Sequence, residues 1–226
     1  MIKHLTILFT LFICVSSCNS EKKERKPISV QTTQLSVAEK IAKAHGLEHW
    51  NNVNRIEFTF QVDRNGQQGN GRAWTWFPKK DSVIMQAGEQ YVKYNRSQMD
   101  SVPPNADQAF INDKFWLLIP FQLVWDEGTT ISEPKTETAP ISKSELNKIT
   151  LTYGSEGGYT PGDAYDIFYD DNFIIREWVF RQGNSQEPTM STTFENYKNF
   201  GGLRLAQEHK MEESDFNLRF TNINVN

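Results

Sequence analysis

The chain has 226 residues with 24 basic and 28 acidic side chains, and its net charge of −4 excludes the strongly basic surface typical of nucleic-acid-binding proteins. Its only two cysteines lie near the N-terminus, which excludes a disulfide scaffold or a thiolate metal site in the rest of the chain. The sequence also lacks the G-x-S-x-G, H-E-x-x-H and glycine-rich phosphate-loop motifs, so we expect a non-catalytic protein without a metal or cofactor.

The N-terminal segment has the layout of an export signal followed by a tether. One lysine precedes an apolar run at 5–15, and small residues then lead to Cys18. This run is shorter than the roughly 20 residues of a membrane-spanning helix, so it suits a cleavable signal. The letters V-S-S-C resemble a bacterial lipobox; the alternative is an ordinary secretory signal with a chance cysteine. We expect a signal peptide at 1–17, then lipidated Cys18 at the start of a flexible polar tether at 18–34.

A short helix is predicted where the tether ends. Ser36 and Glu39 have capping-box spacing, an apolar stripe follows, and Gly46 is placed to end the helix. His45 and His49 have the i, i+4 spacing of metal ligands. Because Gly46 separates them, we interpret these histidines as a polar helix exit and expect no metal site.

Alternation of apolar and polar residues then predicts four antiparallel strands joined by tight turns. Trp74 and Trp76 share one face of the second strand, although the sequence leaves open which face lies inside. Asn65-Gly66 has the composition of a hairpin turn. The expected strands are at 56–62, 71–77, 81–87 and 91–96.

The most apolar stretch of the folded part is Phe115–Gly128. It is too short to cross a bilayer, so it has to be covered by protein. We predict a helix at 106–118, which Pro120 ends because proline cannot donate the next backbone hydrogen bond. The Thr-, Ser- and Pro-containing stretch at 129–144 is predicted to be a loop.

Downstream, the strand pattern returns and continues to the end of the chain. With the first four, these segments make about ten strands, and a sheet of that size curls because strand twist accumulates. The expected fold class is α+β, mainly antiparallel β: a curved open half-barrel of about ten strands in one domain at 35–226, with helices covering the concave face. The later strands are expected at 148–153, 164–169, 173–181, 190–198, 203–211 and 216–225.

A family resemblance follows from these elements in this order. The capped helix, the meander, the Pro120-Phe121-x-Leu123 helical tract and the pattern Phe194-x-x-Tyr197-Lys198-x-x-Gly201-Gly202-Leu203 resemble the LolA/LolB-like superfamily of outer-membrane lipoprotein carriers and receptors, over about residues 35–226. The resemblance implies a half-closed barrel with an apolar cavity for acyl chains. It also implies a lipid-anchored envelope protein, at the outer membrane facing the periplasm or at the cell surface. The family's lid arginine has no match among Arg55, Arg64, Arg72 and Arg96.

Two functions remain open at this point. The first is binding of an acyl chain or another hydrophobic ligand, with the membrane as partner through the N-terminal lipid. The second is a non-catalytic interaction module that stacks exposed Trp74 and Trp76 on a glycan or a partner protein. The candidate cavity residues for the first function are Phe58, Phe60, Trp74, Trp76, Phe115, Trp116, Leu118, Phe121 and Trp178.

Overall fold

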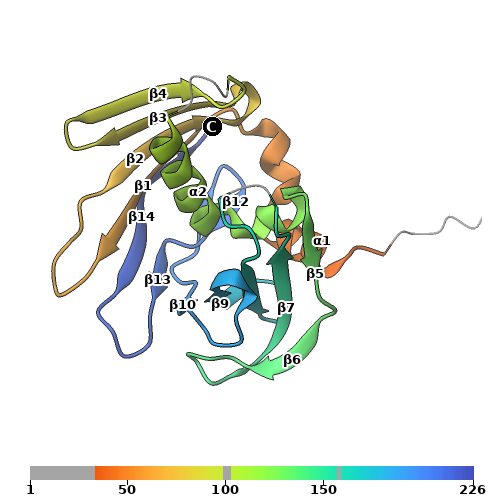
Figure 1. The fold of residues 1–226 in the computed structure, drawn as a ribbon. Coiled ribbons are helices and arrows are strands. Elements are labelled where there is room, and N and C mark those ends of the chain that lie inside the picture. Colours follow the sequence, from red (N-terminus) through yellow and green to blue (C-terminus); the bar gives the residue numbers. More distant parts are fainter. Residues whose placement is uncertain (1–33, 99–102, 157–158) are drawn as a thin grey trace, which may run out of the picture. The chain divides into compact units, whose positions relative to one another are not determined.

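The computed structural model describes residues 34–98, 103–156 and 159–226 (Figure 1). The predicted signal peptide at 1–17, Cys18 and the tether up to residue 33 lie outside the described residues. Contacts between residues group Leu35–Asn226 into one compact unit. Within the described ranges, no helix combines the length and the apolar character needed to span a bilayer.

The first helix, α1 (Val37–Ala44), begins at the predicted capping box. The Ser36 hydroxyl accepts a hydrogen bond from the backbone N–H of Glu39 at 3.2 Å, and the Glu39 carboxylate accepts one from the Ser36 backbone N–H at 2.8 Å. Gly46 follows the helix with φ 95°, a left-handed conformation that glycine adopts without strain, and leads into the 3₁₀ helix η1 (Leu47–Asn52). The capping prediction is confirmed.

The first sheet has six antiparallel strands in the order β13-β14-β1-β2-β3-β4. It contains the predicted meander, and the last strand of the chain pairs with the first strand. Trp74 and Trp76 lie on its buried face, which settles the orientation that the sequence left open. The bounds are β1 (Ile56–Asp63), β2 (Arg72–Phe77), β3 (Ser82–Ala87), β4 (Gln90–Asn95), β13 (Glu208–Lys210) and β14 (Asn217–Val225), with the 3₁₀ turn η2 (Pro78–Lys80) between β2 and β3.

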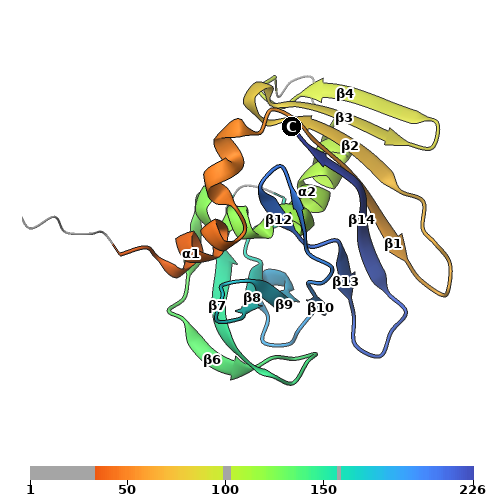
Figure 2. The same ribbon diagram turned by 180° about the vertical axis from the view of Figure 1, so that it is seen from behind.

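The second sheet has the order β10-β9-β8-β7-β5, with β6 also pairing with β7 (Figure 2). A separate hairpin is formed by β11 (Lys198–Phe200) and β12 (Leu203–Leu205). The strands of the second sheet are β5 (Thr129–Ile131), β6 (Lys135–Thr138), β7 (Glu145–Tyr153), β8 (Ala164–Tyr169), β9 (Ile175–Arg181) and β10 (Met190–Thr193), and the short 3₁₀ segment η4 (Gln182–Asn184) follows β9.

The long helix α2 (Pro104–Trp125) lies against the inner face of the first sheet (Figure 1). Its residues Phe110 and Leu117 belong to the core of the first sheet, whereas Ile119 and Leu123 belong to the core of the second sheet. The second half of the helix, 117–123, is buried at every position and is apolar except for Gln122, whereas the first half keeps exposed polar residues such as Asn105 and Asn112.

The prediction that a helix at 106–118 ends before Pro120 is wrong. The helix continues to Trp125 and is locally non-helical at Leu118 (φ −113°, ψ 16°), two residues before the proline. A proline inside a helix removes one backbone hydrogen bond and bends the helix. Because the segments on both sides of this bend are buried, packing holds the helix together across it.

The predicted loop at 129–144 is also wrong, because it contains β5 and β6. Both strands pair with β7 but lie at the sheet's edge, and every residue of β6 except Glu137 is exposed. An exposed edge strand has no apolar face, so the alternation used to predict strands is missing there.

The predicted fold class is confirmed: the described residues form an α+β domain, mainly antiparallel β, with 14 strands in three sheets and no closed barrel. The number exceeds the expected ten because β5 and β6 were missed and because two predicted strands, 190–198 and 203–211, are each divided. The first contains Asn196 with φ 53°, which interrupts an extended strand. The two six-stranded sheets are joined where β10 and the residues after it meet β13, through the isolated antiparallel bridge Glu195↔Glu208 and hydrogen bonds from His209 and Lys210 to Thr193.

Candidate functional site

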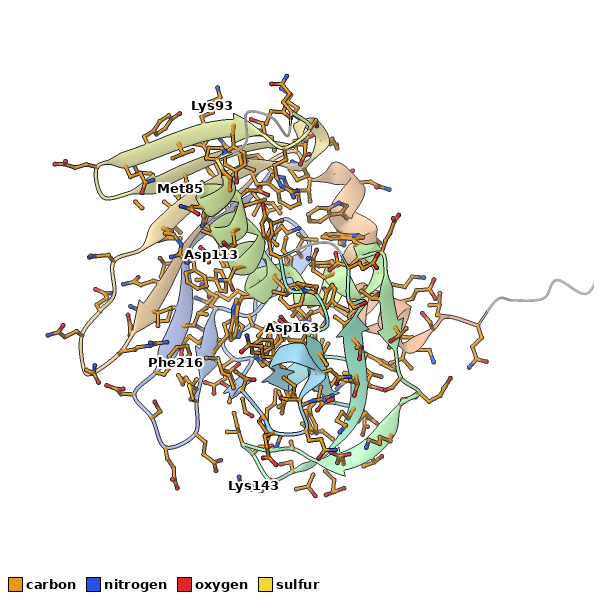
Figure 3. All side chains as sticks on the ribbon, in the orientation of Figure 1. Met85, Lys93, Asp113, Lys143, Asp163 and Phe216 are labelled. Carbon is orange, nitrogen blue, oxygen red and sulfur yellow. The ribbon has the colours of Figure 1, made fainter. Side chains whose placement is uncertain are left out.

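A cavity of about 840 Å³ lies beside α2, with walls from β1 and β14 of the first sheet and from β8, β9 and β10 of the second. Figure 3 labels two nearby side chains for orientation: Asp113 on α2, and Phe216, which precedes β14 and lines the cavity. The apolar lining consists of Phe60, Val62, Ile111, Phe115, Trp116, Trp125, Tyr153, Tyr165, Trp178, Phe180, Met190, Phe216 and Leu218.

One face of α2 forms a wall of the cavity. Gln108, Ile111 and Phe115 follow one another at intervals of three and four residues, which places them on the same side of a helix. Gln122 continues this face beyond the bend at Leu118. Other residues of α2 pack in the cores of the two sheets. The helix therefore contacts both sheets and also lines the cavity.

The aromatic wall of the cavity is a group of packed rings from α2 and the second sheet. Trp178 lies with its ring centroid 4.4 Å from that of Trp116 and 5.8 Å from that of Phe115. Tyr165 lies 4.8 Å from Phe115 and 5.1 Å from Phe180, again between ring centroids. These separations are those of favourable aromatic pairs, so the wall has a defined geometry.

Polar groups gather at another part of the cavity. Arg96 and Tyr159 line it and both bind the Asp107 carboxylate of α2, at 2.7 and 2.8 Å. The Tyr153 hydroxyl donates a hydrogen bond to the Asp126 carboxylate. Burial raises the pKa of Asp126 above the ordinary value for an aspartate. The cavity therefore has an aromatic part and a part lined by polar groups.

Lys114 is the buried cation of this site. The residue lines the cavity, is 9% exposed, and places its Nζ 5.4 Å from the centroid of the Trp76 ring. Burial lowers the pKa of the Lys114 ammonium group to about 8. Among the described residues Nζ forms no hydrogen bond and no ion pair; the ring of Trp76 is its cation–π contact, and the charge of Asp126 acts on it at longer range.

The side chain before Lys114 fixes the helix to the first sheet. Asp113 is fully buried, and its carboxylate accepts hydrogen bonds from Arg72 Nε at 2.8 Å and Arg72 Nη2 at 2.6 Å. The Trp74 indole N–H donates a third at 2.8 Å. The bidentate contact with Arg72 fixes the rotation of α2 about its axis relative to β2. This rotation sets the direction in which the neighbouring side chains of the helix point.

Four of the nine residues predicted to line a cavity do so. These four belong to different parts of the fold, and the structure brings them together around one space. They are Phe60, Phe115, Trp116 and Trp178.

The other five predicted cavity residues do not line this cavity. Each is at most 8% exposed and packs in the core between α2 and the first sheet. Side chains on the inner face of the sheet and on the sheet-facing side of α2 pack against one another. They therefore fill the core and do not border the cavity. These five are Phe58, Trp74, Trp76, Leu118 and Phe121.

The condition that would favour an interaction module, exposed paired tryptophans, is not met. Trp74 and Trp76 are 1% and 8% exposed, because the sheet turns this face toward α2. The described residues therefore contain no exposed Trp74–Trp76 platform on which a glycan or partner protein could stack.

Sequence reasoning missed several lining residues. Tyr165 and Phe180 are directly paired across β8 and β9, but β8 is apolar on both faces, so its pattern does not show which side faces a cavity. Lys114 carried a usable signal: it is a single charge next to the apolar tract that begins at Phe115.

Comparison with protein-family models and with curated proteins finds no match for this chain. Among solved structures, the chain is similar to the crystal structure of a LolA superfamily protein from Nitrosomonas europaea. The two share 10% sequence identity and a TM-score of 0.48, and the match covers 85% of this chain and 94% of the other.

Proposed function

We propose that this protein is a lipid-anchored envelope protein that binds an acyl chain or another hydrophobic ligand in the cavity beside α2, in a non-catalytic role like that of LolA/LolB-type carriers or receptors. The observation that carries the proposal is the cavity itself. Its volume of about 840 Å³ falls in the range of about 300 to 1,000 Å³ of small-molecule sites. Its mainly aromatic and aliphatic lining suits an oily ligand.

The arrangement of the walls supports this proposal. The aromatic rings of Phe115, Trp116 and Trp178 are held against one another, and α2 is fixed by the Asp113–Arg72 contact. A cavity whose walls are already ordered costs little conformational entropy when a ligand enters.

The anchoring part of the proposal rests on the sequence. Cys18 would carry the lipid, and the polar segment at 18–34 would hold the domain away from the membrane. We place the protein at the outer membrane, facing the periplasm or the cell surface. Metabolic labelling with an alkyne fatty acid tests this: the wild type should be labelled and Cys18→Ser should not.

Ligand binding is tested on the full chain carrying Cys18→Ser, which removes the acyl group that would compete for the cavity. Titration with dodecan-1-ol should change the tryptophan emission, because Trp116 and Trp178 line the cavity. Ile111→Trp should abolish this response by filling the space. Tyr91→Trp adds the same side chain at a 60% exposed position on β4 and should leave binding unchanged.

Two results would contradict the proposal. If dodecan-1-ol causes no saturable response, and native mass spectrometry of the purified protein detects no bound lipid, the cavity is not a site for hydrophobic ligands. Equal binding by the wild type and Ile111→Trp would place the ligand elsewhere.

A further inference from the structure

Three basic residues line the cavity, and Lys114 is the buried one that forms no ion pair among the described residues. Arg64 forms none there either, but it is exposed and lies 5.0 Å from the centroid of the Phe216 ring. Arg96, which also lines the cavity, is paired with Asp107 at 2.7 Å and Asp81 at 3.6 Å. Lys114 is more buried, yet its Nζ forms neither an ion pair nor a hydrogen bond within the part of the chain that the structure describes. Burial of most of the Lys114 side chain removes part of the hydration of its ammonium group, and an anion bound in the cavity would offset that cost.

The neighbouring acid does not fill this role. Asp126 lines the same cavity, but its carboxylate accepts the hydrogen bond of Tyr153 and acts on Lys114 only from beyond ion-pair distance. The contact with the Trp76 ring offsets part of the desolvation of Nζ but leaves its donors unused. A negatively charged hydrogen-bond acceptor bound in the cavity would therefore suit Lys114.

The surroundings of Lys114 define the rest of such a ligand. Phe115 and Trp116 line the same cavity as Lys114, and both pack against Trp178 on the aromatic wall. A molecule with its charged end at Lys114 can extend its apolar part along these rings. The arrangement matches an amphiphile with one anionic head and one apolar tail.

We infer that the cavity takes anionic amphiphiles, with the Lys114 ammonium binding a head-group carboxylate and the aromatic wall holding the tail. This inference rests on the proposed function, since it assigns the chemical class of the ligand for the same cavity. The low pKa of Lys114, about 8, agrees with it, because a nearby carboxylate would stabilise the charged form that burial disfavours.

The experiment compares dodecanoate with dodecan-1-ol, which have the same chain length and differ in head-group charge. On the full chain with Cys18→Ser, at pH 7, dodecanoate should bind at least about tenfold more tightly, the effect of one charge-assisted contact. Lys114→Met should lose this preference and keep its affinity for dodecan-1-ol. Lys114→Arg retains the charge and should retain a preference.

A matched control separates the position from the charge. Lys93→Met removes an exposed lysine on β4, which Figure 3 labels on the outside of the first sheet, and should leave the preference intact. Thermal unfolding of Lys114→Met and a second variant, Lys114→Gln, identifies any loss of fold, and for Met we expect equal or higher stability since an unpaired charge leaves the interior.

The outcomes distinguish this inference from the proposed function. If the wild type binds both compounds equally, or if Lys114→Met keeps the preference for dodecanoate, the inference is overturned while hydrophobic binding stands. If neither compound binds, both proposals are wrong.

Discussion

His45 and His209 are buried side chains that remain neutral in the folded protein. Burial lowers the pKa of His45 to about 4 and that of His209 to about 3. Each ring makes one hydrogen bond through Nδ1, to the backbone oxygen of Ile41 and of Thr193 respectively. Protonation would place an unpaired charge inside the core, so the folded state resists it.

The free energy of unfolding therefore falls as the pH is lowered. Unfolding restores the ordinary histidine pKa of about 6.5, so the unfolded chain binds more protons below that pH. The two neutral, buried histidines make their full contribution to stability above pH 6.5. This contribution is lost as the pH falls toward 4 for His45 and toward 3 for His209. We expect each histidine to lower the free energy of unfolding by up to about 1.4 kcal/mol per pH unit in this window.

Urea unfolding of the wild type and His209→Leu between pH 7 and pH 4.5 tests this dependence. The variant should have the shallower decline, since carboxylate effects are common to both proteins. His49→Gln is the matched control, because His49 is largely exposed and should leave the slope unchanged. Parallel curves for the wild type and His209→Leu would contradict the assignment.

At the scale of elements, the attachment of α2 to β2 depends on Asp113. Its carboxylate is fully buried, and it accepts hydrogen bonds from Arg72 and Trp74. Removing one member of such a pair leaves the other without compensation. We expect Asp113→Ala to lower the free energy of unfolding by about 3 kcal/mol or more and to weaken ligand binding through movement of the helix.

Chemical denaturation and dodecan-1-ol titration measure the two effects. The control is Glu212→Ala, which breaks the exposed Lys143–Glu212 pair at 3.0 Å and should cost less than about 1 kcal/mol. Figure 3 shows Asp113 on α2 and Lys143 at the far end of the second sheet's loops. Similar losses for the two variants would mean that the Asp113 contact is not an anchor.

The elements that could be predicted are those with a strong local signal. The helix after Ser36 follows from its capping box, and β1 and β8 follow from their apolar residues and turns. The second half of α2 could not be predicted, because Pro120 is locally unfavourable and only burial on both sides sustains the helix. The edge strands β5 and β6 have no apolar face to reveal them.

At the scale of the whole domain, the sequence predicted the class of fold but not its division into two sheets. Pairing of β14 with β1 joins residues from the two ends of the domain, such as Phe220 and Phe60, and no local pattern specifies such a contact. For the same reason the cavity was predicted only in part. Phe115 and Trp116 lie in a conspicuous tract, whereas Tyr165, Phe180 and Lys114 gain their roles from the packing of both sheets around α2.

The junction between the sheets is shorter than the strand pairs within them. Glu195 forms backbone hydrogen bonds with Glu208 at 2.9 and 3.4 Å and with Gln207 at 3.0 Å, and Thr193 and Glu195 also bind His209 and Lys210, whereas β1 and β14 pair along most of their length. Met190 and Leu218, on the strands that flank this junction, both line the cavity. We therefore expect the amide protons of Glu195 and Glu208 to exchange with deuterium faster than that of Phe60, and to slow when dodecanoate is bound.

Exchange at the junction no faster than at Phe60, or unchanged by dodecanoate, would contradict this expectation. The junction is held by a short group of local contacts, whereas the strand pairs inside each sheet are continuous. We therefore expect the two sheets to separate first at this junction, so that a ligand enters the cavity from the side while the strand pairs of both sheets stay in place.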